Sequence, residues 1–74
     1  MRQHDFVVHG EQTIHCESCE ERIARALQRV PGVREARADH RTQEVRVSTD
    51  DKLSGNELTE RLGRMGYEVR PRGA

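Results

Sequence analysis

The chain has 74 residues, in which 13 basic and 13 acidic side chains cancel to a formal net charge of zero. A chain of this length buries only a thin core and leaves little room for a catalytic cleft, so we expect one domain over residues 1–74 that is not an enzyme. The two signs of charge are interleaved along the chain, which excludes the basic stripe that nucleic-acid binding requires.

The first residues, 2–5, are polar and lead into only three apolar residues, Phe6–Val8. This is not the pattern of a secretory signal peptide, and no apolar stretch of the sequence reaches the length of a membrane span. We therefore expect a cytoplasmic protein that does not insert into membranes. The apolar segment predicts a strand from Phe6 toward Thr13, although Gly10 and the polar pair after it weaken this prediction.

The segment from Cys19 to Val30 predicts an amphipathic helix, because its apolar residues recur at helical spacing. Ser18 followed by Glu21 is a capping-box pattern, which predicts that the helix begins just after Ser18. Pro31 and Gly32 predict its end. Cys19 would then lie in the first turn of the helix.

Two strands are expected next, because Val33–Ala38 and Val45–Thr49 place apolar residues at alternate positions or close to them. The polar segment His40–Gln43 between them predicts a turn, so the two strands would form a hairpin.

A second capping box, Ser54 with Glu57, predicts a second helix that carries Leu58, Leu62 and Met65 on one face. We expect Met65 to pack in the core and Gly66 to end this helix. Residues 67–71 predict a last strand. We expect Arg70, Arg72, Gly73 and Ala74 to form a frayed tail. The order β-α-β-β-α-β predicts a ferredoxin-like α+β fold, a four-stranded antiparallel sheet with both helices on one face.

The only two cysteines, Cys16 and Cys19, stand three residues apart where the first strand gives way to the first helix. In a reducing cytosol they would remain thiols, and a helix N-terminus favours the thiolate form that metals require. Soft thiolates select Cu(I) and also suit Zn(II) or Hg(II). Two ligands on an exposed loop satisfy Cu(I) or Hg(II) better than Zn(II), which usually takes four ligands.

A thiol-redox domain is the alternative function for this C-x-x-C motif. Against it, the chain has neither the length nor the aromatic residue and proline usual around redox motifs. A structural zinc site would need two further ligands at suitable spacing, which the four histidines do not provide: His4, His9, His15 and His40. We interpret His4, His9 and His40 as surface or strand residues.

Three stretches together resemble the heavy-metal-associated domain family: Ile14-His15-Cys16-Glu17-Ser18-Cys19, Val30-Pro31-Gly32-Val33 and Gly66-Tyr67-Glu68-Val69. The resemblance covers about residues 5–70. That family includes bacterial copper chaperones, mercury-binding proteins and the N-terminal domains of metal-transporting P-type ATPases. On its usual pattern, Gly-Met-x-Cys-x-x-Cys, Cys16 and Cys19 match the metal-binding cysteines, whereas Ile14 stands where Met is usual and Thr13 where Gly is usual.

The resemblance implies a metallochaperone or metal-receiving domain in which Cys16 and Cys19 hold Cu(I) and pass it to a partner by ligand exchange. The implied partner is a metal-transporting P-type ATPase or a similar metal-binding domain. A carrier of Zn(II), Cd(II) or Hg(II) with the same fold is the alternative. We expect a monomer or a metal-bridged dimer, and the position of Met1 and of the last strand favours a free-standing chaperone.

Two further residues are candidates for the surroundings of the metal. Tyr67 matches an aromatic residue that shields the metal in copper-binding members of the family, and the other interpretation is an ordinary core residue. The His15 imidazole is placed to add a third ligand or to tune the thiolates, and the other interpretation is a solvated loop histidine.

Overall fold

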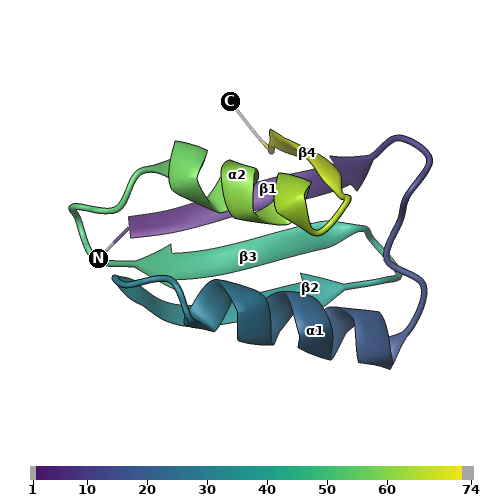
Figure 1. The fold of residues 1–74 in the computed structure, drawn as a ribbon, viewed down its shortest axis with the longest axis horizontal. Coiled ribbons are helices and arrows are strands. Elements are labelled where there is room, and N and C mark those ends of the chain that lie inside the picture. Colours follow the sequence, from purple (N-terminus) through teal and green to yellow (C-terminus); the bar gives the residue numbers. More distant parts are fainter. Residues whose placement is uncertain (1, 73–74) are drawn as a thin grey trace.

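The computed structural model describes residues 2–72, and its elements follow the predicted order (Figure 1). They are β1 (Arg2–His9), α1 (Glu17–Gln28), β2 (Val33–Asp39), β3 (Glu44–Thr49), α2 (Gly55–Arg64) and β4 (Glu68–Pro71). The strands form one antiparallel sheet in the order β2-β3-β1-β4, and both helices cover the same face of it (Figure 1). The predicted ferredoxin-like α+β fold is confirmed.

The core lies between the sheet and the two helices. Phe6 of β1 faces Val45 of β3 across the sheet, and both side chains are buried against the helices. Each helix contributes two fully buried residues from its apolar stripe, namely Ile23, Leu27, Leu58 and Leu62. This packing fixes α1 on the sheet and with it the position of the helix N-terminus. Among residues 2–72, neither helix is long and apolar enough to span a membrane.

The first strand lies nearer to the N-terminus than predicted. It begins at Arg2 and ends at His9, whereas the apolar pattern predicted Phe6 to Thr13. Its polar first half is in the sheet because it pairs with β3, with Arg2 opposite Thr49. The strand ends because Gly10 has φ +86°, a left-handed conformation that glycine adopts without steric cost. The loop from residue 10 to residue 15 therefore replaces the predicted end of the strand.

The predicted N-cap of the first helix is wrong. The helix begins at Glu17, and Cys16, rather than Ser18, is the N-cap in an extended conformation with no side-chain capping bond. The main-chain oxygen of Cys16 accepts the N–H of Glu20 at 3.1 Å, which closes the first turn. Cys19 nevertheless lies in the first turn, as predicted. Ser54 is the N-cap of α2 as predicted, although its side chain also makes no capping bond.

The end of the second helix turns the chain sharply toward β4. Gly66 has φ +97°, and the N–H of Tyr67 donates to the oxygen of Leu62 at 3.0 Å, so Gly66 ends the helical region as predicted. Met65 packs against the core, also as predicted.

The prediction of a frayed tail is wrong for Arg70 and Arg72, which are hydrogen-bonded or paired in the sheet. Arg70 belongs to β4, and the N–H of Arg72 donates to the oxygen of Asp5 in β1 at 2.8 Å. Sequence composition cannot reveal this pairing, because it depends on β4 joining the edge of the sheet next to β1. Gly73 and Ala74, the rest of the predicted tail, lie outside the described residues.

Candidate metal-binding site

Both cysteines lie at the N-terminus of α1. The loop after β1 enters the helix at this end (Figure 1). Both cysteines are free thiols; Cys16 is exposed and Cys19 is partly buried against the edge of the core. The unpaired main-chain N–H groups and the positive end of the helix dipole lie at this point. The structure therefore places two sulfur atoms where negative charge is stabilised and where a partner can reach at least one of them.

The thiol of Cys19 accepts several hydrogen bonds from neighbouring groups. Its pKa lies below the usual value, mainly because the main-chain N–H of His15 donates a hydrogen bond to the sulfur. The burial of the thiol opposes this effect, whereas the main-chain N–H of Cys16, the hydroxyl of Tyr67 and the Cys16 side chain add to it. Cys19 therefore ionises more easily than an ordinary cysteine, and thiolate is the form that binds metals.

Tyr67 lies beside this sulfur. The residue is only 5% exposed, and burial raises the pKa of its hydroxyl, with the hydrogen bond to Cys19 as the next cause. Gln12 and Arg22 act in the opposite direction on the same hydroxyl. The two interpretations of Tyr67 from the sequence are thus compatible: the ring is part of the core, while the hydroxyl reaches Cys19.

His15 contributes to the site through its main chain. Its side chain is exposed, while its N–H binds the sulfur of Cys19. Within residues 2–72, one group of three His, Cys, Asp or Glu side chains lies close enough together to hold a metal ion, namely Glu20, Asp39 and His40. Neither cysteine belongs to this group. In this conformation, therefore, no further His, Cys, Asp or Glu side chain among the described residues lies within reach of both cysteines.

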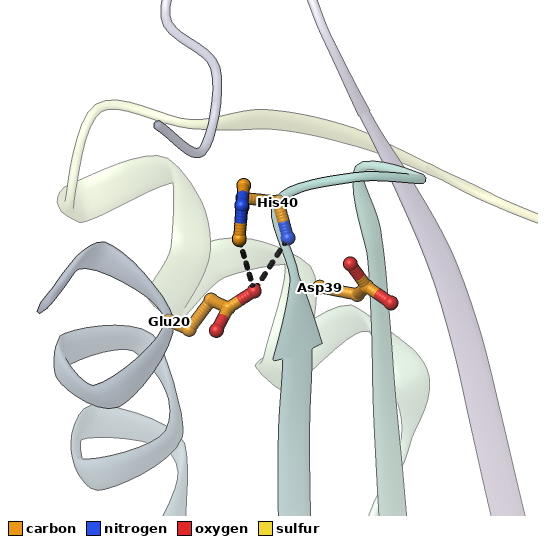
Figure 2. Close-up of side chains that lie close together, drawn as sticks. All are labelled: Glu20, Asp39 and His40. Atoms are coloured by element: carbon orange, nitrogen blue, oxygen red, sulfur yellow. Dashed lines mark hydrogen bonds and ion pairs between the residues drawn. The ribbon is translucent and has the colours of Figure 1, made fainter. Parts of the chain in front are cut away.

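The group of Glu20, Asp39 and His40 joins α1 to the turn between β2 and β3 (Figure 2). One oxygen of Glu20, Oε2, lies 2.7 Å from both the main-chain nitrogen and the ring Nδ1 of His40. A carboxylate only accepts hydrogen bonds, so Nδ1 carries the proton. The carboxylate of Asp39 points away from this pair in Figure 2 and accepts the N–H of Arg41 at 2.8 Å. We interpret the group as a hydrogen-bonded connection between two elements.

The interpretation of His40 as a plain surface or strand residue therefore needs correction. The ring is partly buried and bonded to Glu20, which itself follows Cys19 directly in the sequence. The pKa of Glu20 is lowered, first by the main-chain N–H of His40 and then by its ring. The sequence carries no local signal for this contact, because the two residues lie 20 positions apart.

Gln43 is a second residue that the sequence analysis missed. Its side-chain oxygen accepts the N–H of Ile14 at 2.8 Å, and its side-chain nitrogen donates to the oxygen of Ile14 at 2.8 Å and to that of His40 at 2.6 Å. The one available signal was negative: the predicted turn, residues 40–43, holds no Gly or Asn, although such turns commonly need a left-handed residue.

Comparisons with known proteins show the family and the fold of the chain. A family model described as the heavy-metal-associated domain matches residues 12–68. No match was found among curated proteins. The CopZ metallochaperone is 26% identical, with a TM-score of 0.83, over 93% of this chain and 100% of that one. Oxidised MerP from Ralstonia metallidurans CH34 is 25% identical, with a TM-score of 0.83, over 97% of both chains.

A third similar structure is the Cu(I)-loaded N-terminal domain of a potential copper-translocating P-type ATPase from Bacillus subtilis. It is 26% identical to this chain, with a TM-score of 0.82, and the match covers 96% of this chain and 86% of that one.

Proposed function

Because the chain belongs to the heavy-metal-associated domain family, we propose that it carries one Cu(I) ion on the thiolates of Cys16 and Cys19. The observation that carries this proposal is the pair of free thiols at the N-terminus of α1, one of which has a lowered pKa. Thiolates are soft ligands and bind Cu(I) in preference to hard cations. The ion is cargo, which the domain receives and hands on.

The number of ligands supports Cu(I) over Zn(II). Zinc in proteins is usually held by four ligands, and within residues 2–72 the cysteines belong to no group of three or more candidate ligand side chains. Cu(I) and Hg(II) accept two thiolates. The ATPase domain from Bacillus subtilis is named as Cu(I)-loaded, and this likeness favours Cu(I) as the cargo of this chain too.

Transfer to a partner would proceed by exchange of thiolate ligands. A thiolate of the partner attacks the bound Cu(I) and becomes a third ligand, and then the thiolates of this chain leave one after the other. No electron is transferred, and the N–H groups around Cys19 stabilise the negative charge that returns to its sulfur. The partner we propose is a metal-binding domain of a metal-transporting P-type ATPase, met in the cytoplasm.

The hydroxyl of Tyr67 fits this role because it binds Cys19 from the buried side, leaving Cys16 exposed to the partner. We propose that Tyr67 shields the ion on the inner side and that Cys16 is the sulfur on which exchange begins. The His15 imidazole is not required as a third ligand.

The test is an anaerobic competition between the reduced protein and a coloured Cu(I) chelator, with Zn(II), Cd(II) and Hg(II) titrated in parallel. We expect one tightly held Cu(I) per chain, lost in Cys16→Ser and in Cys19→Ser, and weaker binding of Zn(II). Stronger binding of Zn(II) or Cd(II) than of Cu(I) would show a carrier of those ions instead, and selective retention of Hg(II) would show a mercury carrier.

Two further measurements on the same protein separate the remaining alternatives. A titration with dithiothreitol tests the thiol-redox function: an oxidising disulfide that exchanges with a test substrate, together with no tight metal binding, would replace the proposal. Sedimentation with and without Cu(I) shows whether the loaded protein is a monomer or a metal-bridged dimer.

A further inference from the structure

Gln43 has an unusual backbone conformation. Its φ is +62°, and within residues 2–72 the other residues with positive φ are glycines. Residues with a Cβ rarely adopt this left-handed region, and Asn does so more readily than Gln. Such a conformation persists only where the surrounding structure enforces it, and it often marks a functional position.

The side chain of Gln43 provides a reason for this conformation. It pairs with both polar main-chain groups of Ile14, accepting its N–H and donating to its oxygen, each at 2.8 Å. This is the way in which a neighbouring strand would pair, but residues 12–15 belong to no strand or helix. The main-chain oxygen of Gln43 also accepts the N–H of Val8 in β1 at 2.8 Å. Gln43 thus connects the end of β1 and the loop after it.

The contact with Ile14 continues to Cys19 through a single peptide group. The oxygen of Ile14 and the N–H of His15 belong to the same peptide, which is planar and trans. Gln43 holds the oxygen on one side, and the N–H on the other side binds the sulfur of Cys19. Fixing the direction of the oxygen therefore fixes the direction of the N–H that contacts the sulfur.

The same turn also holds the residue after the cysteines. The main-chain N–H of His40 donates to Glu20, and the main-chain oxygen of His40 accepts the side-chain nitrogen of Gln43 at 2.6 Å. Figure 2 shows the contact between Glu20 and His40. The turn of residues 40–43 is therefore bonded to both ends of the segment that carries Cys16 and Cys19.

We propose that Gln43 is a positioning residue of the metal site, which holds the Ile14–His15 peptide so that the two sulfur atoms are arranged for the ion before it binds. The inference rests on the proposed function and adds to it a residue 24 positions beyond Cys19 in the sequence. Holding a site in its bound arrangement lowers the entropic cost of binding. Loss of residues that orient metal ligands typically weakens metal binding by about 10- to 100-fold.

Two substitutions test the proposal without adding backbone strain. Gln43→Gly and Gln43→Asn both fit the left-handed conformation better than Gln does, and neither reaches both polar groups of Ile14. We expect each to raise the Cu(I) dissociation constant about tenfold, measured at one pH by chelator competition. We also expect the amide of Ile14 to exchange its hydrogen about tenfold faster in the metal-free variants, since it loses its acceptor.

Thr42→Gly is the matched control, because it adds the same chain flexibility to the same turn at an exposed position and leaves Gln43 in place. Its Cu(I) affinity and the exchange at Ile14 should stay within about twofold of the parent protein. If loosening the turn were enough to weaken the site, Thr42→Gly would lose thermal midpoint and Cu(I) affinity together with the two Gln43 variants, and the positioning role would be wrong.

The outcomes separate this inference from the proposed function. If the parent protein binds Cu(I) and the two Gln43 variants bind it within twofold of the parent, the positioning role is wrong while the proposed function stands. If the parent protein binds no Cu(I), the proposed function fails and the positioning role falls with it. Faster exchange at Ile14 without any loss of affinity also overturns the inference, because the contact would then not reach the sulfur atoms.

Discussion

At the scale of single residues, the hydroxyl of Tyr67 is the side-chain group from outside the C-x-x-C segment that binds the sulfur of Cys19. Tyr67→Phe keeps the buried ring and removes this hydrogen bond. We expect the pKa of Cys19 to rise, because the lost hydroxyl stabilised the thiolate. The rise should be small, because the main-chain N–H of His15, which lowers this pKa most, is unchanged.

The measurement is the rate of alkylation by iodoacetamide as a function of pH, with Cys16→Ser in both proteins so that one thiol reacts. The curve for Tyr67→Phe should move to higher pH, with the same maximal rate. Arg22→Gln serves as the control for long-range charge, because Arg22 acts on the Tyr67 hydroxyl through its charge. A curve that stays in place or moves to lower pH would mean that the hydroxyl does not stabilise the thiolate.

The sequence predicted the residues whose signal is local and missed those whose role depends on distant contacts. Cys16 and Cys19 are marked by their spacing, and Tyr67 by the resemblance to a family. The contact of Gln43 with Ile14 joins residues 29 positions apart, and the local signal for the backbone conformation it needs is only the lack of Gly or Asn in the turn. A glutamine in a turn is common enough that its sequence alone does not distinguish a positioning residue from a solvated one.

At the scale of elements, Glu20 joins the first turn of α1 to the turn between β2 and β3. The pKa of Glu20 is lowered from 4.5, chiefly by the main-chain N–H of His40, while the charge of Asp39 opposes this. A carboxyl group with a lowered folded-state pKa adds stability that is fully present above the unfolded value, here 4.5. This stability is lost as the pH falls through the lower folded value.

We therefore expect Glu20→Gln to destabilise the metal-free protein most above pH 4.5, with a difference from the parent protein that shrinks on acidification. Urea denaturation at neutral pH and at several lower values measures it. Glu21→Gln is the matched control, an exposed carboxylate one position further along the same helix. A difference that grows as the pH falls would contradict the sign derived from the lowered pKa.

Local sequence patterns did not suffice to predict where the helices and strands begin. The number, type and order of the helices and strands follow from hydrophobic periodicity, but β1 was predicted four residues too late because Arg2–Asp5 carry no alternating apolar pattern. Pairing with β3 supplies their hydrogen bonds instead. In the same way, α1 begins before its capping-box pattern, because the main-chain oxygen of Cys16 already accepts the N–H of Glu20.

At the scale of the whole molecule, the core is small, so binding of the proposed Cu(I) ion would supply a large part of the stability. A ligand that binds only the folded state at 100 times its dissociation constant adds about 2.7 kcal/mol, and in a domain of this size 1 kcal/mol raises the thermal midpoint by about 4–8 °C. Anaerobic thermal unfolding with buffered Cu(I) should therefore show a rise of about 10–20 °C at that concentration. The protein with both Cys16→Ser and Cys19→Ser should show none.

The size of this rise also measures how far the fold prepares the site. The cysteines are only three positions apart, so the unfolded chain keeps some affinity for Cu(I), and this reduces the stabilisation below the value calculated from the folded-state dissociation constant. At one free Cu(I) concentration the stabilisation should be smaller for Gln43→Gly than for the parent protein, because the variant's folded-state dissociation constant is higher while the unfolded chain binds Cu(I) equally well. An equal stabilisation of both proteins would mean that the helix N-terminus and the packing of α1 alone arrange the two sulfur atoms.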